Sequence, residues 1–132
     1  MIHLLPEDPP LMVGILPQFL KLPCRRGSHA VLLSHHTFEH IRARRENEHP
    51  FHLSLVLSRL ETVIADPSHY GCLSREPHKL DIWAWNPSDF CGVLVSLKCL
   101  PGETWVNTAF PLGTKTLRKH VLRDKLRALR GA

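Results

Sequence analysis

The hydrophobic period of the chain changes at Asp66-Pro67, and this change most restricts the folds that the chain can adopt. Before it, from residue 50 or 51 to 65, apolar residues recur every three or four positions, which predicts a buried amphipathic helix. After it, apolar and polar residues alternate with a period near two, which predicts strands. The sequence therefore predicts an α+β fold in which helices precede an antiparallel sheet.

Three strands and a final helix are expected after this change. The strands cover residues 79–86, 90–100 and 103–110, and the turns between them, 86–89 and Pro101-Gly102, indicate an antiparallel meander. A weaker strand is expected at 70–74. From residue 114 or 116 to 130 the pattern predicts a basic amphipathic helix. Its apolar side would hold Leu117, Val121, Leu122, Lys125 and Leu129.

A tight turn at Pro101-Gly102 fixes an expected register for the last hairpin. Lys98 would then lie opposite Trp105, and Ser96 opposite Asn107. One face of the hairpin would pack on the helices, with Val93, Val95, Leu97, Val106, Thr108 and Phe110. The other face would be a polar and aromatic working surface, with Leu94, Ser96, Lys98, Trp105, Asn107 and Ala109. A bulge in the long strand would exchange the two faces.

The stretch from 34 to 46 predicts a helix with an unusual density of titratable side chains. Ser34 is a favourable N-cap residue. His36, His40 and Arg44 follow at four-residue spacing and share one helix face, with Arg45 on the neighbouring face. Imidazole transfers protons near neutral pH, and guanidinium groups bind phosphate. The alternative is a solvated basic face with incidental histidines.

Length, composition and cysteine spacing bound the class of protein. A chain of 132 residues can form one domain with a single core. Five of the eleven prolines fall in the first 27 residues, so we expect an irregular lead-in over 1–28 and one domain over 29–132. The four cysteines are widely spaced, and we expect reduced thiols, no metal site and no cofactor.

Charge and the N-terminal sequence suggest a partner and a location. The formal net charge is +5 and the pI is near 9.3, which favours a polyanionic partner. The N-terminus has acids and prolines where a secretory signal needs an apolar core, and we find no membrane span. We therefore expect a cytoplasmic protein that does not bind a membrane.

Three motifs in a fixed order resemble the barnase, EndoU, colicin and RelE-like (BECR) ribonuclease superfamily, and most of all its phage-associated branch. Ser34 with His40-Ile41 matches the first helix of that branch, Asp66-Pro67 the end of its second helix, and residues 106–110, Val-Asn-Thr-Ala-Phe, its last strand. The resemblance covers roughly residues 28 to 112. It implies a nuclease domain built of two helices and a meander.

The resemblance also implies a toxin-like endoribonuclease that cleaves RNA without a metal. In that chemistry the ribose 2′-OH attacks the adjacent phosphate and leaves a 2′,3′-cyclic phosphate. By match, His40 would be the acid or base, and Thr108 a phosphate or ribose contact. The residue pattern adds Lys98, Arg44 or Arg45 as charge stabilisers. Further substrate contacts are expected from Asn107, Trp105, His36 and Ser96, with Trp83 and Trp85 as other stacking candidates.

Three classes of function stay open on the sequence alone. The first is the endoribonuclease, whose partners would be RNA, with tRNA as one candidate, and an acidic inhibitor or immunity protein. The second is a non-catalytic basic module of phage or bacterial origin that binds nucleic acid or protein. The third is an enzyme of another kind on a similar α+β frame. The sequence does not choose the RNA, and the chain could be part of a longer toxin.

Overall fold

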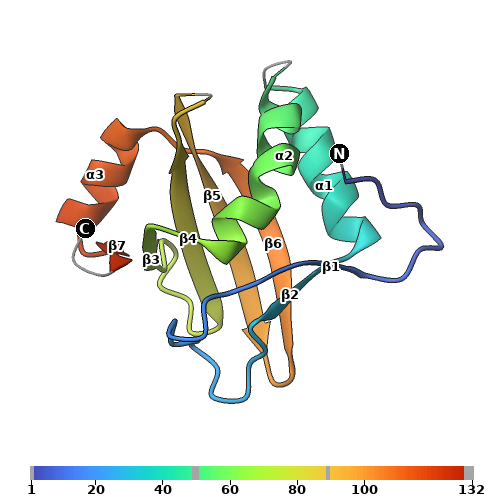
Figure 1. Ribbon diagram of the computed structural model, residues 1–132, viewed down its shortest axis with the longest axis horizontal. Coiled ribbons are helices and arrows are strands. Elements are labelled where there is room, and N and C mark those ends of the chain that lie inside the picture. Colours follow the sequence, from blue (N-terminus) through green and yellow to red (C-terminus); the bar gives the residue numbers. More distant parts are fainter. Residues whose placement is uncertain (1, 49–50, 89, 130–132) are drawn as a thin grey trace.

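The computed structural model describes residues 2–48, 51–88 and 90–129, and within them the α+β class predicted from the sequence is confirmed. Three helices and seven strands are described, and the strands form one sheet in the order β1-β2-β6-β5-β4-β3-β7 (Figure 1). Neighbouring strands pair antiparallel except β2 and β6, which are parallel. The strands are β1 Leu11–Ile15, β2 Ala30–Leu33, β3 His69–Gly71, β4 Lys79–Asn86, β5 Cys91–Leu100, β6 Glu103–Pro111 and β7 Leu126–Ala128; the helices are α1 His35–Glu46, α2 His52–Ala65 and α3 Thr114–Leu122.

The two helices of the first half begin and pack for identifiable reasons. Ser34 is the N-cap of α1, and its hydroxyl accepts a hydrogen bond from the Thr37 N–H at 3.2 Å. In α2 the predicted apolar stripe is buried, with Val56, Leu57, Leu60, Val63 and Ile64 facing the sheet. Each such side chain contributes about 1.5–3 kcal/mol when it leaves water, so this stripe holds α2 on the sheet. Pro50, expected in its first turn, lies outside the described residues.

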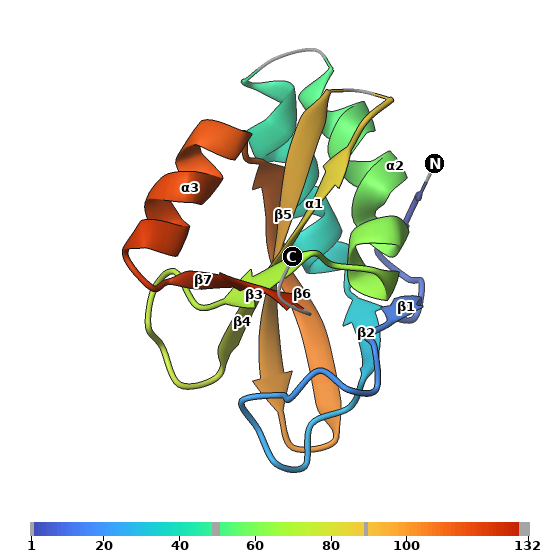
Figure 2. The ribbon, with the colours of Figure 1, turned by 60° about the vertical axis from the view of Figure 1, so that its left-hand side comes forward.

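The sheet has a hydrophobic cluster on each face. Helices α1 and α2 cover one face, and α3 lies on the other (Figures 1 and 2). The smaller cluster, under α3, is formed by Trp83, Leu94, Leu112, Leu117 and Leu126. The Trp83 indole N–H donates to the Leu112 carbonyl at 2.8 Å, so this tryptophan is a core residue. A stacking role for Trp83 is therefore excluded by its burial.

The proline-rich lead-in adds a strand to the sheet. β1 pairs antiparallel with β2, and Val13, Leu16 and Leu20 are buried in the larger cluster. The prolines at 9, 10 and 17 flank this strand and do not interrupt it, which is why it can form. The described part of the lead-in, residues 2–28, thus contributes to the core of the domain and is not an irregular segment apart from it.

The final helix is shorter than predicted, and its expected apolar side does not pack as one surface. α3 ends at Leu122, whereas the pattern predicted helix to residue 130, which lies outside the described residues. Asp124 has a φ of 58°, and the Lys125 N–H donates to the His120 carbonyl at 2.9 Å, the hydrogen bond of a Schellman helix end. The chain then turns into β7, and Leu122 is left 87% exposed.

The register of the last hairpin differs from the prediction because of one extra residue in β6. Lys98 pairs with Trp105 as predicted, but Ser96 pairs with Thr108 and not with Asn107. The bulge at Asn107 moves every later residue of β6 to the other face. Ala109 therefore lies in the larger cluster and Phe110 packs against the smaller one, which reverses the predicted faces of both.

Candidate active site

A cleft of about 270 Å³ lies between α1 and the bulged part of β6. We call it the α1–β6 cleft. It brings together two segments that are far apart in the sequence, and five of the site residues predicted from the sequence line it. Its lining residues are His36, Thr37, His40, Arg44, Asn107 and Thr108.

Helix α1 presents its polar stripe to the cleft because its apolar stripe is buried. Phe38 and Ile41 pack in the larger cluster. His36, His40 and Arg44 lie on a different face at intervals of four residues, and all three are exposed. Side chains spaced in this way are neighbours along a helix, about 5–6 Å apart at their Cβ atoms. The cleft can therefore present two imidazoles and a guanidinium group to one bound ligand.

Thr108 supplies a hydroxyl group that is not used by the fold. Its Oγ1 is buried and has no hydrogen-bond partner among the described residues. A buried polar group without a partner costs about 1–3 kcal/mol. Bulges often occur next to active sites, where they redirect side chains, and the extra residue Asn107 lies immediately before Thr108. Thr108 therefore lines the cleft with a hydroxyl group that makes no hydrogen bond to the described residues.

Arg45 does not line the cleft, although the sequence suggested it as a charge stabiliser. It is 5% exposed, its guanidinium carbon lies 5.8 Å from the centre of the Phe110 ring, and its Nη2 lies 3.2 Å from Glu48. Burial lowers its pKa from the ordinary value, with Glu48 opposing that effect. The neighbouring helix face on which it was expected is the packed face, so Arg45 joins α1 to β6 and Arg44 supplies the cleft's guanidinium.

Three predicted residues of the last hairpin also lie outside the cleft. Ser96 is buried in β5 opposite Thr108, while Lys98 is exposed and pairs with Trp105. The Trp105 indole N–H donates to the Glu103 carboxylate at 2.9 Å. Lys98 and Trp105 share a sheet face on the hairpin-turn side of the bulge, and neither lines the cleft. Trp85, 41% exposed, lies at the far end of β4.

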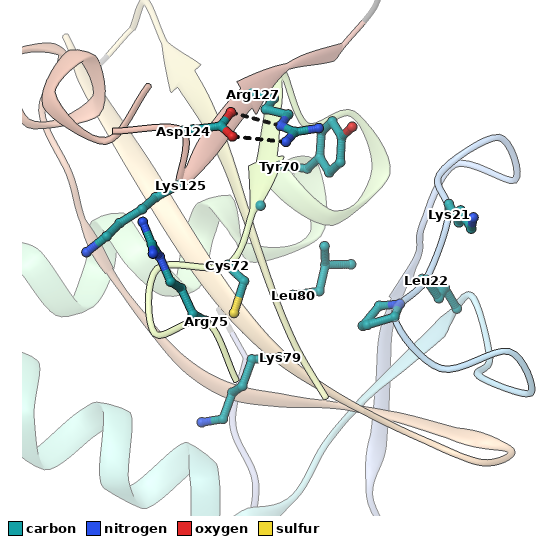
Figure 3. A pocket seen from close by; sticks show the side chains of 12 residues that line it. Lys21, Leu22, Tyr70, Cys72, Arg75, Lys79, Leu80, Asp124, Lys125 and Arg127 are labelled. Carbon is teal, nitrogen blue, oxygen red and sulfur yellow. Dashed lines mark hydrogen bonds and ion pairs between the residues drawn. The ribbon is translucent and has the colours of Figure 1, made fainter. Parts of the chain in front are cut away.

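A second cavity, of about 490 Å³, lies around β3, β7 and the start of β4 (Figure 3). We call it the basic pocket. Sequence reasoning did not find it, because its cations come from three separate stretches of the chain and form no local motif. Its lining residues are Lys21, Leu22, Pro23, Tyr70, Gly71, Cys72, Arg75, Lys79, Leu80, Asp124, Lys125 and Arg127.

Neither cavity offers a set of metal ligands. Across residues 2–48, 51–88 and 90–129, no three His, Cys, Asp or Glu side chains are grouped so that they could hold a metal ion. Burial raises the pKa of the Cys99 thiol to about 11, so this cysteine is an inert core residue. None of the helices in these ranges is both long and apolar enough to span a lipid bilayer.

Comparison with protein-family models, with curated proteins and with solved structures finds no match to this chain.

Proposed function

We propose that this protein is a metal-independent endoribonuclease, of toxin type, whose active site is the α1–β6 cleft. One observation supports the proposal above the others. His40, chosen from the sequence as the proton-transfer group, shares one cleft with Arg44 and with Thr108, the residue expected to contact phosphate or ribose. A helix and a strand that are far apart in the sequence supply these groups, so local sequence alone does not explain their meeting.

The cleft contains the two groups that proton transfer requires. A neutral imidazole would take the proton of the ribose 2′-OH, and that oxygen would attack the adjacent phosphorus. The bond from phosphorus to the 5′-oxygen then breaks, and a protonated imidazole would give its proton to the leaving oxygen. His40 and His36 lie one turn apart in the cleft, so the pair can divide these two roles.

The remaining groups of the cleft suit the charge that develops on the phosphate. The guanidinium of Arg44 can form two parallel hydrogen bonds to phosphate oxygens. The Thr108 hydroxyl, which has no partner among the described residues, can donate to the same group. Asn107, half-buried beside it, offers an amide for a ribose or base contact. The mechanism uses protein side chains alone.

The expected partners follow from the same chemistry. The net charge of +5 favours RNA as substrate, and tRNA is one candidate. An acidic inhibitor or immunity protein would neutralise the basic surface, as a cell that makes a toxic ribonuclease needs. A cytoplasmic site of action agrees with an RNA substrate.

Replacing His40 with Ala tests the proposal. Cleavage of a single-stranded RNA should slow by roughly 10²- to 10⁴-fold, the usual loss for a general acid or base. The thermal unfolding midpoint should stay nearly unchanged, because His40 is exposed. His52→Ala, a histidine of α2 that does not line the cleft, is the matched control and should retain full activity. EDTA should not inhibit the wild type. Full activity in His40→Ala would contradict the proposal.

A non-catalytic RNA-binding module is the second candidate, and the basic pocket is the observation that favours it. That pocket lies outside the α1–β6 cleft, and it can bind an anion whether or not the cleft is catalytic. The two candidates differ in bacterial expression: a ribonuclease should be tolerated poorly until His40 is replaced, whereas a binding module should be tolerated equally well with either residue.

A further inference from the structure

We propose that the basic pocket binds a nucleotide of the RNA strand outside the α1–β6 cleft, so that the substrate is held at two places. The identity of the ligand as RNA rests on the proposed function. The proposal that the pocket binds an anionic ligand rests on the shape of the pocket, its charge and its position on the sheet.

The pocket combines an apolar wall with cationic side chains, the two surfaces that a nucleotide requires. Its volume of about 490 Å³ falls in the usual range for small-ligand sites. Leu22, Tyr70 and Leu80 offer apolar and aromatic surface to a base (Figure 3). In the same view Arg75, Lys79 and Lys125 stand on the side of the pocket opposite Lys21, where a phosphate would meet several cations.

The charge of the pocket is not balanced by its own residues. Five cations line it, Lys21, Arg75, Lys79, Lys125 and Arg127, against the single carboxylate of Asp124. Asp124 is already bound by Arg127 through two hydrogen bonds of 3.1 Å. Lys79 has Glu76 at 3.6 Å, but no described carboxylate is within ion-pair distance of Lys21, Arg75 or Lys125. An anion would therefore find three cations, Lys21, Arg75 and Lys125, that have no carboxylate partner among the described residues.

The backbone is restricted at two positions beside the pocket's cations. A Cβ on Gly71 would lie 2.0 Å from the Lys125 carbonyl oxygen, so only glycine allows β3 to lie directly against the start of β7. Arg75 has a φ of 58°, a left-handed conformation that is unfavourable for a long side chain. Both restrictions, the close approach at Gly71 and the left-handed backbone of Arg75, thus occur where Arg75 and Lys125 line the pocket.

A row of side chains leads from the pocket towards the cleft. Lys79 in β4 pairs with Lys98 in β5, and Lys98 pairs with Trp105 in β6, so the three lie on one sheet face. Two strand spacings separate the ends of this row, about 10 Å. Asn107 and Thr108 of the cleft follow Trp105 in β6. Directly opposed lysines repel each other, and a phosphate near both would relieve that repulsion.

This arrangement favours RNA over an acidic protein as the occupant. An acidic protein surface would meet a flat or convex basic patch, whereas these cations border a concave site with an aromatic residue in its wall. The row through Lys98 and Trp105 also offers one charge and one stacking surface in succession, which suits the repeating phosphate and base of a single strand.

The experiment measures binding of a fluorescent 2′-O-methyl RNA oligonucleotide, which lacks the attacking hydroxyl and is not cleaved. Neutralising Arg75→Gln and Lys125→Gln together should weaken binding about tenfold and lower the log–log salt slope by about 1.4, since each lost single-strand phosphate contact removes roughly 0.7. Lys115→Gln with Arg118→Gln, two exposed residues of α3 that do not line the pocket, is the matched control and should change binding less than threefold.

Asp124→Asn provides a gain-of-function test. Asparagine tolerates the left-handed conformation of this position, and removing the carboxylate frees Arg127, so affinity for the oligonucleotide should rise severalfold. Unchanged or weaker binding would overturn the proposal, as would equal losses in the pocket variant and the α3 control. Equal competition by poly-glutamate and by poly-adenylate at matched charge would instead indicate an acidic protein partner and overturn the nucleotide assignment.

A second readout separates this proposal from the proposed function. Cleavage of a dinucleotide, which fills only the α1–β6 cleft, should be unaffected by Arg75→Gln and Lys125→Gln, while kcat/KM on a long RNA should fall about tenfold. If binding depends on the pocket but no RNA is cleaved, the pocket proposal is supported and the proposed ribonuclease function is contradicted. If long RNA is cleaved equally well by the wild type and the pocket variant, the ribonuclease function is supported and the pocket proposal is contradicted. Unchanged thermal unfolding shows that the variants are folded; where the double variant loses stability, the exposed Arg75→Gln single variant replaces it.

Discussion

At the scale of single residues, two threonines of β6 use their hydroxyl groups in opposite ways. Thr104 is buried, and its hydroxyl donates to the Ser28 carbonyl. The Thr108 hydroxyl is buried without a described partner. A fold selected for stability alone would favour valine at position 108, which has nearly the same shape and a higher preference for strands. The retained hydroxyl therefore suggests a role in function.

Thr108→Val should separate activity from stability. The change removes a buried polar group without a partner, so the free energy of unfolding should rise by up to about 1 kcal/mol, while RNA cleavage should fall at least tenfold. Thr104→Val is the control and should lower the free energy of unfolding by about 1 kcal/mol, because it leaves the Ser28 carbonyl without its donor. Urea unfolding and initial cleavage rates measure both effects. Destabilisation by Thr108→Val with unchanged activity would assign the hydroxyl to the fold.

The helical residues of the cleft and their common face could be predicted from the sequence. For the strand, the residues could be predicted but not the sheet face on which Thr108 lies. His36, His40 and Arg44 were correctly placed on one face because helix geometry fixes which residues are neighbours four positions apart. Thr108 was expected on the wrong face, since a bulge at Asn107 depends on how two strands meet and leaves no periodic signal. Lys98 and Trp105 were predicted in the correct register and expected at the site, but neither of them lines the cleft.

At the scale of elements, the long and strongly patterned segments were predictable, and so was the short strand β3, but β1 and β7 were not. α2 was expected from its apolar stripe, which is buried against the sheet. β1 and β7, of five and three residues, are too short to have a period, and neighbouring strands determine their conformation. The end of α3 was missed because Asp124 adopts a conformation that glycine or asparagine would have signalled more clearly.

Gly92→Ala should disrupt the contact between β5 and the α3 side of the sheet. A Cβ at this position would lie 2.2 Å from the Trp83 ring, and Trp83 also binds the Leu112 carbonyl, so displacement of the ring costs both packing and a hydrogen bond. We expect the free energy of unfolding to fall by about 2–4 kcal/mol. Gly113→Ala, where an added Cβ meets nothing within 4 Å, should cost less than about 1 kcal/mol. Equal urea midpoints for the two variants would contradict this packing.

At the scale of the whole molecule, two half-buried histidines should make stability depend on pH. Burial lowers the pKa of His69 and of His120 below the ordinary value of 6.5; Lys125 and Arg123 add to the effect at His120, and Asp81 opposes it. Below pH 6.5 the unfolded chain binds protons at these positions before the folded chain does. Unfolding then takes up protons, so the free energy of unfolding falls as the pH is lowered from about 6.5 towards the folded-state pKa values.

Thermal unfolding between pH 7.5 and pH 5 measures this effect. The unfolding midpoint of the wild type should fall as the pH is lowered across this range. In His120→Gln the midpoint should fall less, because the contribution of His120 is removed. A midpoint that rises on acidification, or an identical slope in His120→Gln, would contradict the burial of these imidazoles as neutral groups.

The central claim is that the α1–β6 cleft cleaves RNA by attack of the ribose 2′-OH, and one substrate tests it most directly. An RNA oligonucleotide is prepared with a single 2′-deoxyribose at the mapped cut, beside the all-ribose parent, and both are incubated with the protein in EDTA. The parent should be cut to a fragment ending in a 2′,3′-cyclic phosphate, whereas the 2′-deoxy substrate should resist at that position because it lacks the nucleophile. Efficient cutting at the 2′-deoxy position, or no cutting of any RNA by the wild type, would contradict the account.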